Sequence, residues 1–152
     1  MINQIEVREI TIPAKLPKVL NQMHDLFGVT DPQKSIRCGT QVDLLALEHP
    51  MVMGWLRGVA RGELIGAWSN RVANGGGHVR HKHPRGGRSN VVYVTTPDAG
   101  SGHLVFYDAA HRPVRRIVPR AGMVVSFPCS LEHATTRYKG DAPRLAVAFD
   151  TR

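Results

Sequence analysis

Apolar residues recur along the first part of the chain with two different periods. Residues 5–12 alternate apolar and polar side chains, which predicts a strand. Over residues 14–27 the apolar positions return every three or four residues, which predicts a helix with one buried face. Residues 41–60 predict a second helical region, interrupted near Pro50 and closed by Gly58 and Gly62. The first part of the chain is therefore expected to contribute a strand and two helical regions.

Beyond residue 62 the pattern changes to short apolar or alternating segments, each bounded by Gly, Pro, Asp or Asn. These segments are 64–72, 78–83, 90–96, 103–107, 113–118, 122–127, 132–138 and 143–150. Short strands at this spacing predict a mainly β fold, a sandwich or barrel, and the glycine-rich run 74–77 is expected to be a tight loop. We expect one domain over residues 1–152. Residues 1–62 would form the strand and the helices that cover the outside, and 63–152 would form the barrel.

Length and composition limit the class of protein. A chain of 152 residues with 42% hydrophobic residues is long enough and apolar enough for a globular core. No apolar run approaches the roughly 18 residues of a membrane span, so no membrane partner is expected. Cys38 and Cys129 lie far apart and in no metal-binding spacing. We therefore expect a cytoplasmic protein with neither a disulfide framework nor a cysteine zinc site.

The net charge of +8 belongs to the second part of the chain. Residues 1–50 carry five basic and six acidic side chains, whereas residues 51–152 carry fifteen and six. Three interpretations stay open: a solvated basic face, a field that steers a small anionic ligand, and a nucleic-acid surface. The basic runs lack interleaved aromatic residues and any nucleic-acid-binding signature, so nucleic acid is not expected as a partner.

Histidines carry the strongest chemical signal in the sequence. In the run from residue 78 to 83, His81 and His83 are two residues apart and would share one face of a strand. His133, near the start of a later predicted strand, is the candidate for a third metal ligand. The alternative is a polar strand that binds nothing. The scattered histidines are expected at the surface or its boundary: His24, His49, His103 and His111.

Around these histidines the sequence resembles the 2-oxoglutarate- and iron(II)-dependent oxygenases, in particular a small bacterial and phage branch of the prolyl-hydroxylase type. The resemblance extends over about residues 64–150 in one order. It includes Trp68-Ser-Asn70, His81-Lys-His83-Pro84, Val91-Val-Tyr93-Val, Gly102-His-Leu-Val-Phe106, Gly122-Met-Val-Val-Ser-Phe127-Pro128, His133 and Pro143-Arg144. It implies a double-stranded β-helix, the jelly-roll barrel shared with cupins, holding Fe(II) in its mouth.

The resemblance also implies roles for single residues. His81 and His133 match the first and last metal ligands. Arg144 matches the residue that pairs with the far carboxylate of 2-oxoglutarate, a task that suits the planar guanidinium. Tyr93 matches a contact of that cosubstrate, and Asn70 a polar residue near the iron or the cosubstrate.

One metal ligand departs from the family pattern. Most members have Asp or Glu where this chain has His83, so the facial triad becomes three histidines and the site is one unit more positive. Imidazole remains a good ligand for Fe(II).

The function implied is oxidation of a substrate C–H bond by O2, coupled to decarboxylation of 2-oxoglutarate to succinate. A small molecule is the expected substrate, and arginines expected around the mouth favour an anionic or carboxylate-bearing one. These arginines are Arg71, Arg80, Arg85, Arg88 and Arg137. Arg137 shares strand parity with His133 and is expected to point inward.

Two alternatives use the same barrel. A cupin-type protein would hold a metal on His81, His83 and His133, as three-histidine thiol dioxygenases or isomerases of this type do, without 2-oxoglutarate. The cupin interpretation leaves Arg144 without a role. The other alternative is a barrel that binds a metal or ligand without catalysis.

Overall fold

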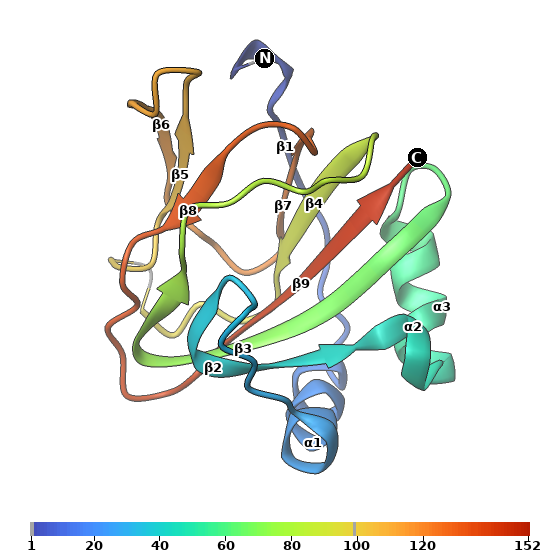
Figure 1. Cartoon of the computed structure of the whole chain (residues 1–152). Helices are drawn as coiled ribbons and strands as arrows, with labels where there is room; N and C mark the ends of the chain where they lie inside the picture. The colour runs from blue at the N-terminus through green and yellow to red at the C-terminus, as the bar shows by residue number, and fades with distance from the viewer. Residues whose placement is uncertain (1, 99) are drawn as a thin grey trace.

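The strands of the chain form two antiparallel sheets (Figure 1). The computed structural model describes residues 2–98 and 100–152. The six-stranded sheet has the order β1-β7-β4-β9-β3-β2, and the three-stranded sheet has the order β6-β5-β8. The strands are β1 (Glu6–Glu9), β2 (Ile36–Asp43), β3 (Leu64–His78), β4 (Arg88–Tyr93), β5 (Leu104–Tyr107), β6 (Pro113–Ile117), β7 (Met123–Pro128), β8 (His133–Thr135) and β9 (Arg144–Thr151).

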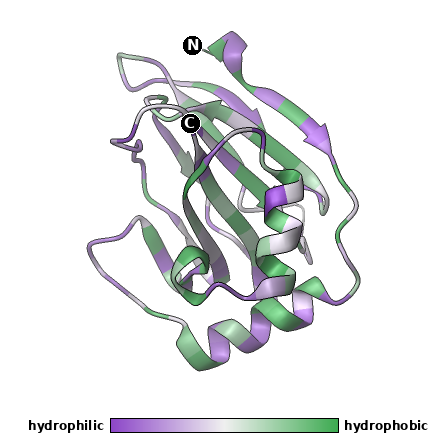
Figure 2. Ribbon diagram, turned by 90° about the vertical axis from the view of Figure 1, so that its right-hand side faces the viewer, coloured by the Kyte–Doolittle hydropathy of each residue, from purple (hydrophilic) through white to green (hydrophobic). Residues whose placement is uncertain are grey.

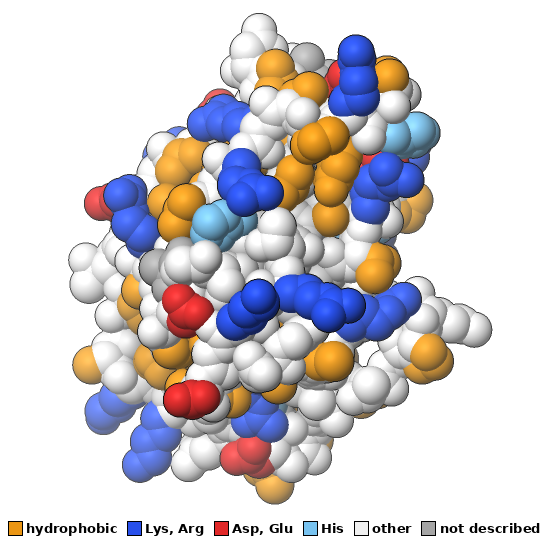
Figure 3. All heavy atoms as spheres, turned by 90° about the vertical axis from the view of Figure 1, so that its left-hand side faces the viewer, with side chains coloured by type: hydrophobic (Ala, Val, Ile, Leu, Met, Phe, Trp, Pro, Cys, Tyr) orange, Lys and Arg blue, Asp and Glu red, His pale blue; other side chains and the backbone are white. Residues whose placement is uncertain are grey.

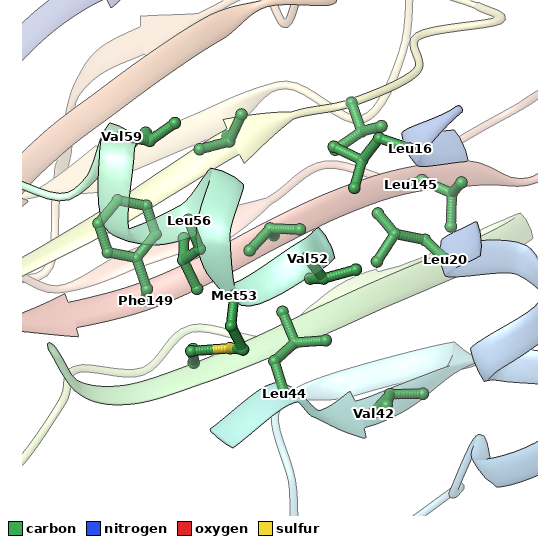
Figure 4. Packing of buried hydrophobic residues seen from close by; sticks show 14 of the residues in the cluster. Leu16, Leu20, Val42, Leu44, Val52, Met53, Leu56, Val59, Leu145 and Phe149 are labelled. Atoms are coloured by element: carbon green, nitrogen blue, oxygen red, sulfur yellow. The ribbon is translucent and has the colours of Figure 1, made fainter. Parts of the chain in front are cut away.

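The helices lie in the N-terminal part of the chain, and the three α-helices lie along one face of the six-stranded sheet (Figure 2). They are a 3-10 turn η1 (Ile2–Gln4), α1 (Leu16–Phe27), α2 (Leu44–Leu47) and α3 (Pro50–Val59). Figure 4 shows how α1 and α3 direct aliphatic side chains at the sheet, among them Leu20 and Leu56, which meet Leu145 and Phe149 of β9. The prediction of a mainly β fold with the N-terminal helices on its outside is confirmed.

A second apolar cluster fills the space between the two sheets. Val125 and Phe127 of β7 point into it from the large sheet, and Leu104 and Phe106 of β5 point into it from the small one. The rings of Phe106 and Phe127 meet edge to face, with their centroids 4.9 Å apart. The large sheet is therefore buried on both faces, by helices on one side and by the small sheet on the other.

Strand β2 is absent from the sequence prediction, which assigned part of it to a helical region. Residues 36–43 pair with β3 instead, and only α2 and α3 are helical in the predicted range 41–60. The pairing of the two strands is interrupted between Arg37 and Gly39, opposite Gly77 and Val72, so the extra residues lie on β3. Cys38, between them, has a φ of +50°, which breaks the regular extended backbone of β2. Asp43 then begins α2, because its carboxylate accepts a hydrogen bond from the N–H of Ala46 at 3.1 Å.

The prediction of a tight loop at residues 74–77 is wrong, because β3 continues through them to His78. The glycines serve a close approach between strands. A Cβ on Gly76 would lie 2.7 Å from the carbonyl oxygen of Cys38, inside normal contact distance. β2 can therefore lie against this part of β3 only where side chains are missing.

His24 lies in the interior, contrary to the prediction that it is a surface or boundary residue. It is 3% exposed, on the face of α1 that packs against the sheet. Its ring nitrogens are 2.7 Å from Oγ1 of Thr40 and 2.9 Å from Oγ of Ser69. Burial lowers its pKa to about 4, aided by the positive charge of Arg71, so the ring is neutral at pH 7.

In the part of the chain that the structure describes, no helix combines the length and apolarity needed to cross a bilayer.

Candidate metal centre

Three imidazoles converge at one end of the space between the sheets. The ligand nitrogens of His81, His83 and His133 all lie within 4.8 Å of one another. The ring centroids of His81 and His133 are 4.3 Å apart, and the centroid of His83 is 5.3 Å from each of them. The structure thus brings together the three histidines that the sequence singled out.

The backbone that carries these histidines is not the regular strand predicted over 78–83. β3 ends at His78, and His81 forms an isolated bridge with His133, in which each N–H donates to the other's carbonyl oxygen at 2.9 Å. The N–H of His83 donates to the carbonyl oxygen of Cys129 at 3.0 Å. Both residues of the His-x-His pair are therefore held by backbone bonds to the segment around β8.

The Nδ1 atom of each ring has a hydrogen-bond acceptor in the protein. Nδ1 of His81 donates to the carbonyl oxygen of Val79 at 2.6 Å, and Nδ1 of His133 donates to that of Leu131 at 2.9 Å. Nδ1 of His83 lies 3.0 and 2.9 Å from Oδ1 and Oδ2 of Asp150. Carbonyl and carboxylate oxygens only accept here, so the ring proton is on Nδ1 and the lone pair is on Nε2 in all three rings.

Burial favours the form of His81 and His133 that binds metals. It lowers the pKa of His133 to about 3, with a smaller effect from nearby His81. Burial also lowers the pKa of His81, against the hydrogen bond to Val79, which raises it. Neutral imidazole nitrogens suit iron, zinc, copper and nickel ions. The donor set therefore fits a metal ion, and three ligands leave coordination positions free for other molecules.

A cavity of about 100 Å³ extends from the histidines between the sheets. Its walls include Trp68 and Asn70 of β3 and the inward face of β9, formed by Arg144, Ala146 and Ala148. The other face of β9, formed by Leu145, Val147 and Phe149, packs against the helices. The small side chains in the middle of β9, Ala146 and Ala148, leave room for the cavity. Arg144 and Asp150 lie at opposite ends of this strand.

Arg144 is buried without an acidic partner. It is 4% exposed, and none of the described carboxylates lies within ion-pair distance of it. Its Nη atoms donate to the carbonyl oxygens of Ser101 at 3.2 Å and Gly102 at 2.9 Å. Its guanidinium carbon lies 5.0 Å from the ring centroid of Tyr138 and 5.7 Å from that of Tyr93. A buried cation of this kind favours an anion in the adjoining cavity.

Gly102 makes room for that guanidinium. Its φ of +63° lies in the left-handed region, and a Cβ there would lie 2.6 Å from Nη1 of Arg144.

Tyr93 and Asn70, the two residues assigned to the cosubstrate by resemblance, both line the cavity. Tyr93 is 3% exposed, and burial raises its pKa to about 12 although the positive charge of Arg144 opposes the shift. Its hydroxyl is therefore a neutral hydrogen-bonding group at pH 7. Oδ1 of Asn70 accepts a hydrogen bond from Nε2 of Gln41 at 2.8 Å, which fixes the orientation of the amide.

The five arginines expected around the mouth are not brought to the cavity, since none is among its described lining residues. Arg71 pairs with Asp25 of α1 at 2.8 Å, and Arg80 pairs with Glu132 at 3.4 Å. Arg85 donates to the backbone carbonyl oxygen of Ile65. Arg88 donates to those of Gln4 and Ser126. Arg137 is exposed, because β8 ends at Thr135 and the strand parity that predicted an inward side chain stops there.

Basic side chains are instead distributed over the molecular surface, including the face formed by the small sheet (Figure 3).

Sequence reasoning missed two cavity-side groups. His78 lines the cavity, with Nδ1 3.0 Å from Oγ of Ser35, and burial lowers its pKa to about 3. Asp150 is 2% exposed beside His83. It has the same strand parity as Arg144, and a charged residue on a face otherwise made of alanines was the signal available in the sequence.

Comparisons with solved structures identify the fold as that of the 2OG-Fe(II) oxygenases, a double-stranded β-helix. A viral collagen prolyl hydroxylase from Paramecium bursaria chlorella virus-1, solved as a 2OG complex, is similar at 13% identity. That match covers 97% of this chain and 94% of the viral one with a TM-score of 0.69. HygX from Streptomyces hygroscopicus, solved with nickel and 2-oxoglutarate bound, is similar at 13% identity over 96% and 81% of the two chains, with a TM-score of 0.70.

A more distant likeness is to oxalate decarboxylase from Lactobacillus farciminis. The two sequences are 20% identical, and the match has a TM-score of 0.55. The match covers 85% of this chain and 32% of the decarboxylase. No protein-family model matches the amino-acid sequence, and no curated protein matches it. The comparisons therefore establish the fold, and the chemistry has to be argued from the site.

Proposed function

We propose that this protein is a 2-oxoglutarate- and Fe(II)-dependent dioxygenase that oxidises a small-molecule substrate. The observation that carries the proposal is the pairing of two groups across one cavity. Three imidazoles lie at one end, and a buried arginine without an acidic partner among the described residues lies at the other. A dicarboxylate that is a metal chelator at one end and an anion at the other matches both groups.

His81, His83 and His133 would hold the ion through Nε2, since each Nδ1 already has a protein acceptor. Arg144 would bind the carboxylate of 2-oxoglutarate remote from the metal, with the Tyr93 hydroxyl as a second donor. The bound Fe(II) supplies the activation of O2. In the overall reaction one oxygen atom enters the substrate and the other enters succinate, with loss of CO2.

The protein contributes orientation and an enclosed site. The guanidinium of Arg144 is fixed by two carbonyl oxygens and two tyrosine rings, so it is placed before the cosubstrate binds. Phe127 and Leu104 give the cavity an apolar wall, which limits water near the histidines. 2-Oxoglutarate would span the cavity of about 100 Å³ from the histidines to Arg144, so the substrate would approach the metal from outside that space. An anionic substrate would meet the arginines on the surface, because Arg144 is reserved for the cosubstrate.

Anaerobic titration with Fe(II), with and without 2-oxoglutarate, tests this function. We expect a visible iron-to-keto-acid charge-transfer band that needs both components and is lost in His133→Ala. Fe(II) binding that does not change with 2-oxoglutarate would contradict the proposal and favour the cupin-type function. The three-histidine set and the likeness to oxalate decarboxylase support that alternative. Absence of Fe(II) binding would leave only a barrel without metal-dependent catalysis.

A further inference from the structure

Of the three histidines, only His83 has a charged acceptor at Nδ1. His81 and His133 donate to neutral backbone carbonyl groups, whereas His83 donates to the carboxylate of Asp150 at 2.9 Å. Asp150 is 2% exposed, and at ion-pair distance its partner among the described residues is the His83 ring. Burying a carboxylate is costly, so a buried one beside a candidate ligand needs a physical reason.

The carboxylate is itself held in place by the sheet. Asp150 on β9 pairs directly with Ser89 on β4, and Oγ of Ser89 donates to Oδ1 of Asp150 at 2.8 Å. The sulfur of buried Cys129 lies 3.4 Å from the same hydroxyl. Two adjacent strands therefore fix the carboxylate, which in turn fixes the ring plane of His83.

The three-imidazole set brings no negative charge to a divalent ion. A carboxylate that accepts a hydrogen bond from the Nδ1–H of a metal-binding histidine raises the basicity of its Nε2 atom. It also selects the tautomer of the ring. Asp150 stands in that position relative to His83 and to neither of the other two rings. It is therefore the group that offsets the absence of a carboxylate among the three histidine ligands.

We propose that Asp150 is a positioning residue of the metal centre, which orients His83 with Nε2 toward the ion and supplies the negative charge that the three imidazoles lack. This inference rests on the metal site of the proposed function. It adds that affinity for the ion depends on a carboxylate that does not touch it.

The test compares the full-length wild-type chain with Asp150→Asn, which keeps the shape of the side chain and removes its charge. Calorimetric titration with Ni²⁺ is expected to give a dissociation constant about 10- to 100-fold higher for Asp150→Asn. Ser89→Ala is the matched control, because it removes a hydrogen bond to Asp150 and leaves the charge in place. It is expected to change the constant by less than Asp150→Asn does.

A nitrogen-15 NMR spectrum of the histidine rings shows which nitrogen of His83 carries the proton. A purely structural role of Asp150 would not change that position. In the metal-free wild type we expect the proton of His83 on Nδ1. In Asp150→Asn we expect some of it on Nε2, with His81 and His133 unchanged because carbonyl oxygens hold them. A wild-type His83 protonated on Nε2 overturns the inference even if the variant does not fold.

The outcomes separate the two proposals. If the wild type binds Ni²⁺ and Asp150→Asn binds it within twofold, the role of Asp150 is refuted while the proposed function stands. If the wild type does not bind Ni²⁺ at all, the metal site and the inference built on it fail together.

Discussion

At the scale of single residues, the cavity joins two groups with opposite demands. The histidines must be neutral at Nε2 to bind a metal, and burial favours that form of His81 and His133 by lowering their pKa values. Arg144 stays charged although buried, because two carbonyl oxygens and the faces of two tyrosine rings surround its guanidinium. The same buried cavity thus favours neutral His81 and His133 and a charged Arg144, because the contacts of these side chains differ.

Replacing Arg144 by Leu tests its assignment to the cosubstrate. A charged hydrogen-bonded pair contributes about 1.5–3 kcal/mol, so we expect the concentration of 2-oxoglutarate needed for half-saturation to rise roughly tenfold or more. Fe(II) binding should be unchanged, since Arg144 lies at the other end of the cavity. The exposed Arg137→Leu is the matched control, and an equal effect of both substitutions would refute the role of Arg144.

His24 predicts how stability depends on pH. Its folded pKa of about 4 lies below the ordinary value of 6.5, so between these values the unfolded chain binds a proton that the folded chain does not. Stability should therefore fall as the pH decreases from about 6.5 to about 4, by up to about 1.4 kcal/mol per pH unit for this residue.

Urea denaturation of the wild type and His24→Gln over that range checks this dependence. Asp25 and Arg71, the charged groups nearest to the ring, are retained in both proteins. The difference in unfolding free energy between the two should change with pH in the predicted direction. A difference that stays constant with pH would contradict the depressed pKa.

At the scale of elements, β9 shows what alternation predicts and where it stops. Its two faces follow from period two alone, which places Arg144 beside the alanines and Phe149 beneath the helices. The same rule predicted a strand at residues 78–83, and the chain there forms only the bridge at His81. The histidines still converge, because backbone bonds to the segment around β8 replace a regular ladder.

Long-range contacts explain what the sequence could not predict. Asp150 meets His83 across 67 positions of the chain, and no local pattern encodes that distance. β2 is likewise defined by its partner β3, and the break in their pairing at Cys38 interrupts its regular backbone. The five arginines were expected around the mouth, but contacts with other parts of the fold hold four of them, and Arg137 lies beyond the end of its strand.

Helix α3 offers a prediction at this scale. Gly58 was expected to close the helix, but it lies within Pro50–Val59, as Gly54 does. A Cβ at Gly54 would have no atom within 4 Å outside its own helix. Gly54→Ala should therefore raise the free energy of unfolding by about 0.5–1 kcal/mol, as measured by urea denaturation. Gly102→Ala is the contrasting variant and should lower it, and a loss of stability in Gly54→Ala would contradict the open space seen here.

At the scale of the whole molecule, the large sheet separates two packed regions. The helices cover one face (Figure 1). The other face holds the cavity and its histidines. His81 and His83 follow β3, whereas His133 begins β8, so a shared ion would link the two sheets. Metal binding and folding should therefore be coupled.

Thermal unfolding with Ni²⁺ measures that coupling. A ligand at 100 times its dissociation constant stabilises the folded state by about 2.7 kcal/mol, so the melting temperature should rise with the Ni²⁺ concentration. His133→Ala should abolish the rise. Leu56→Ala, in the cluster beneath the helices, should lower the melting temperature without Ni²⁺. Ni²⁺ should still raise the melting temperature of this variant by the same amount as in the wild type. A rise that persists in His133→Ala would place the ion elsewhere.

The most direct measurement of the central claim is a crystal structure of the protein with Ni²⁺, read through the anomalous signal of the metal. We predict one peak per chain, bonded at roughly 2.0–2.2 Å to the Nε2 atoms of His81, His83 and His133. The Nδ1 atoms should keep their present partners, Asp150 among them. A peak bonded to fewer than three of these rings, or one located away from them, would contradict a shared metal centre.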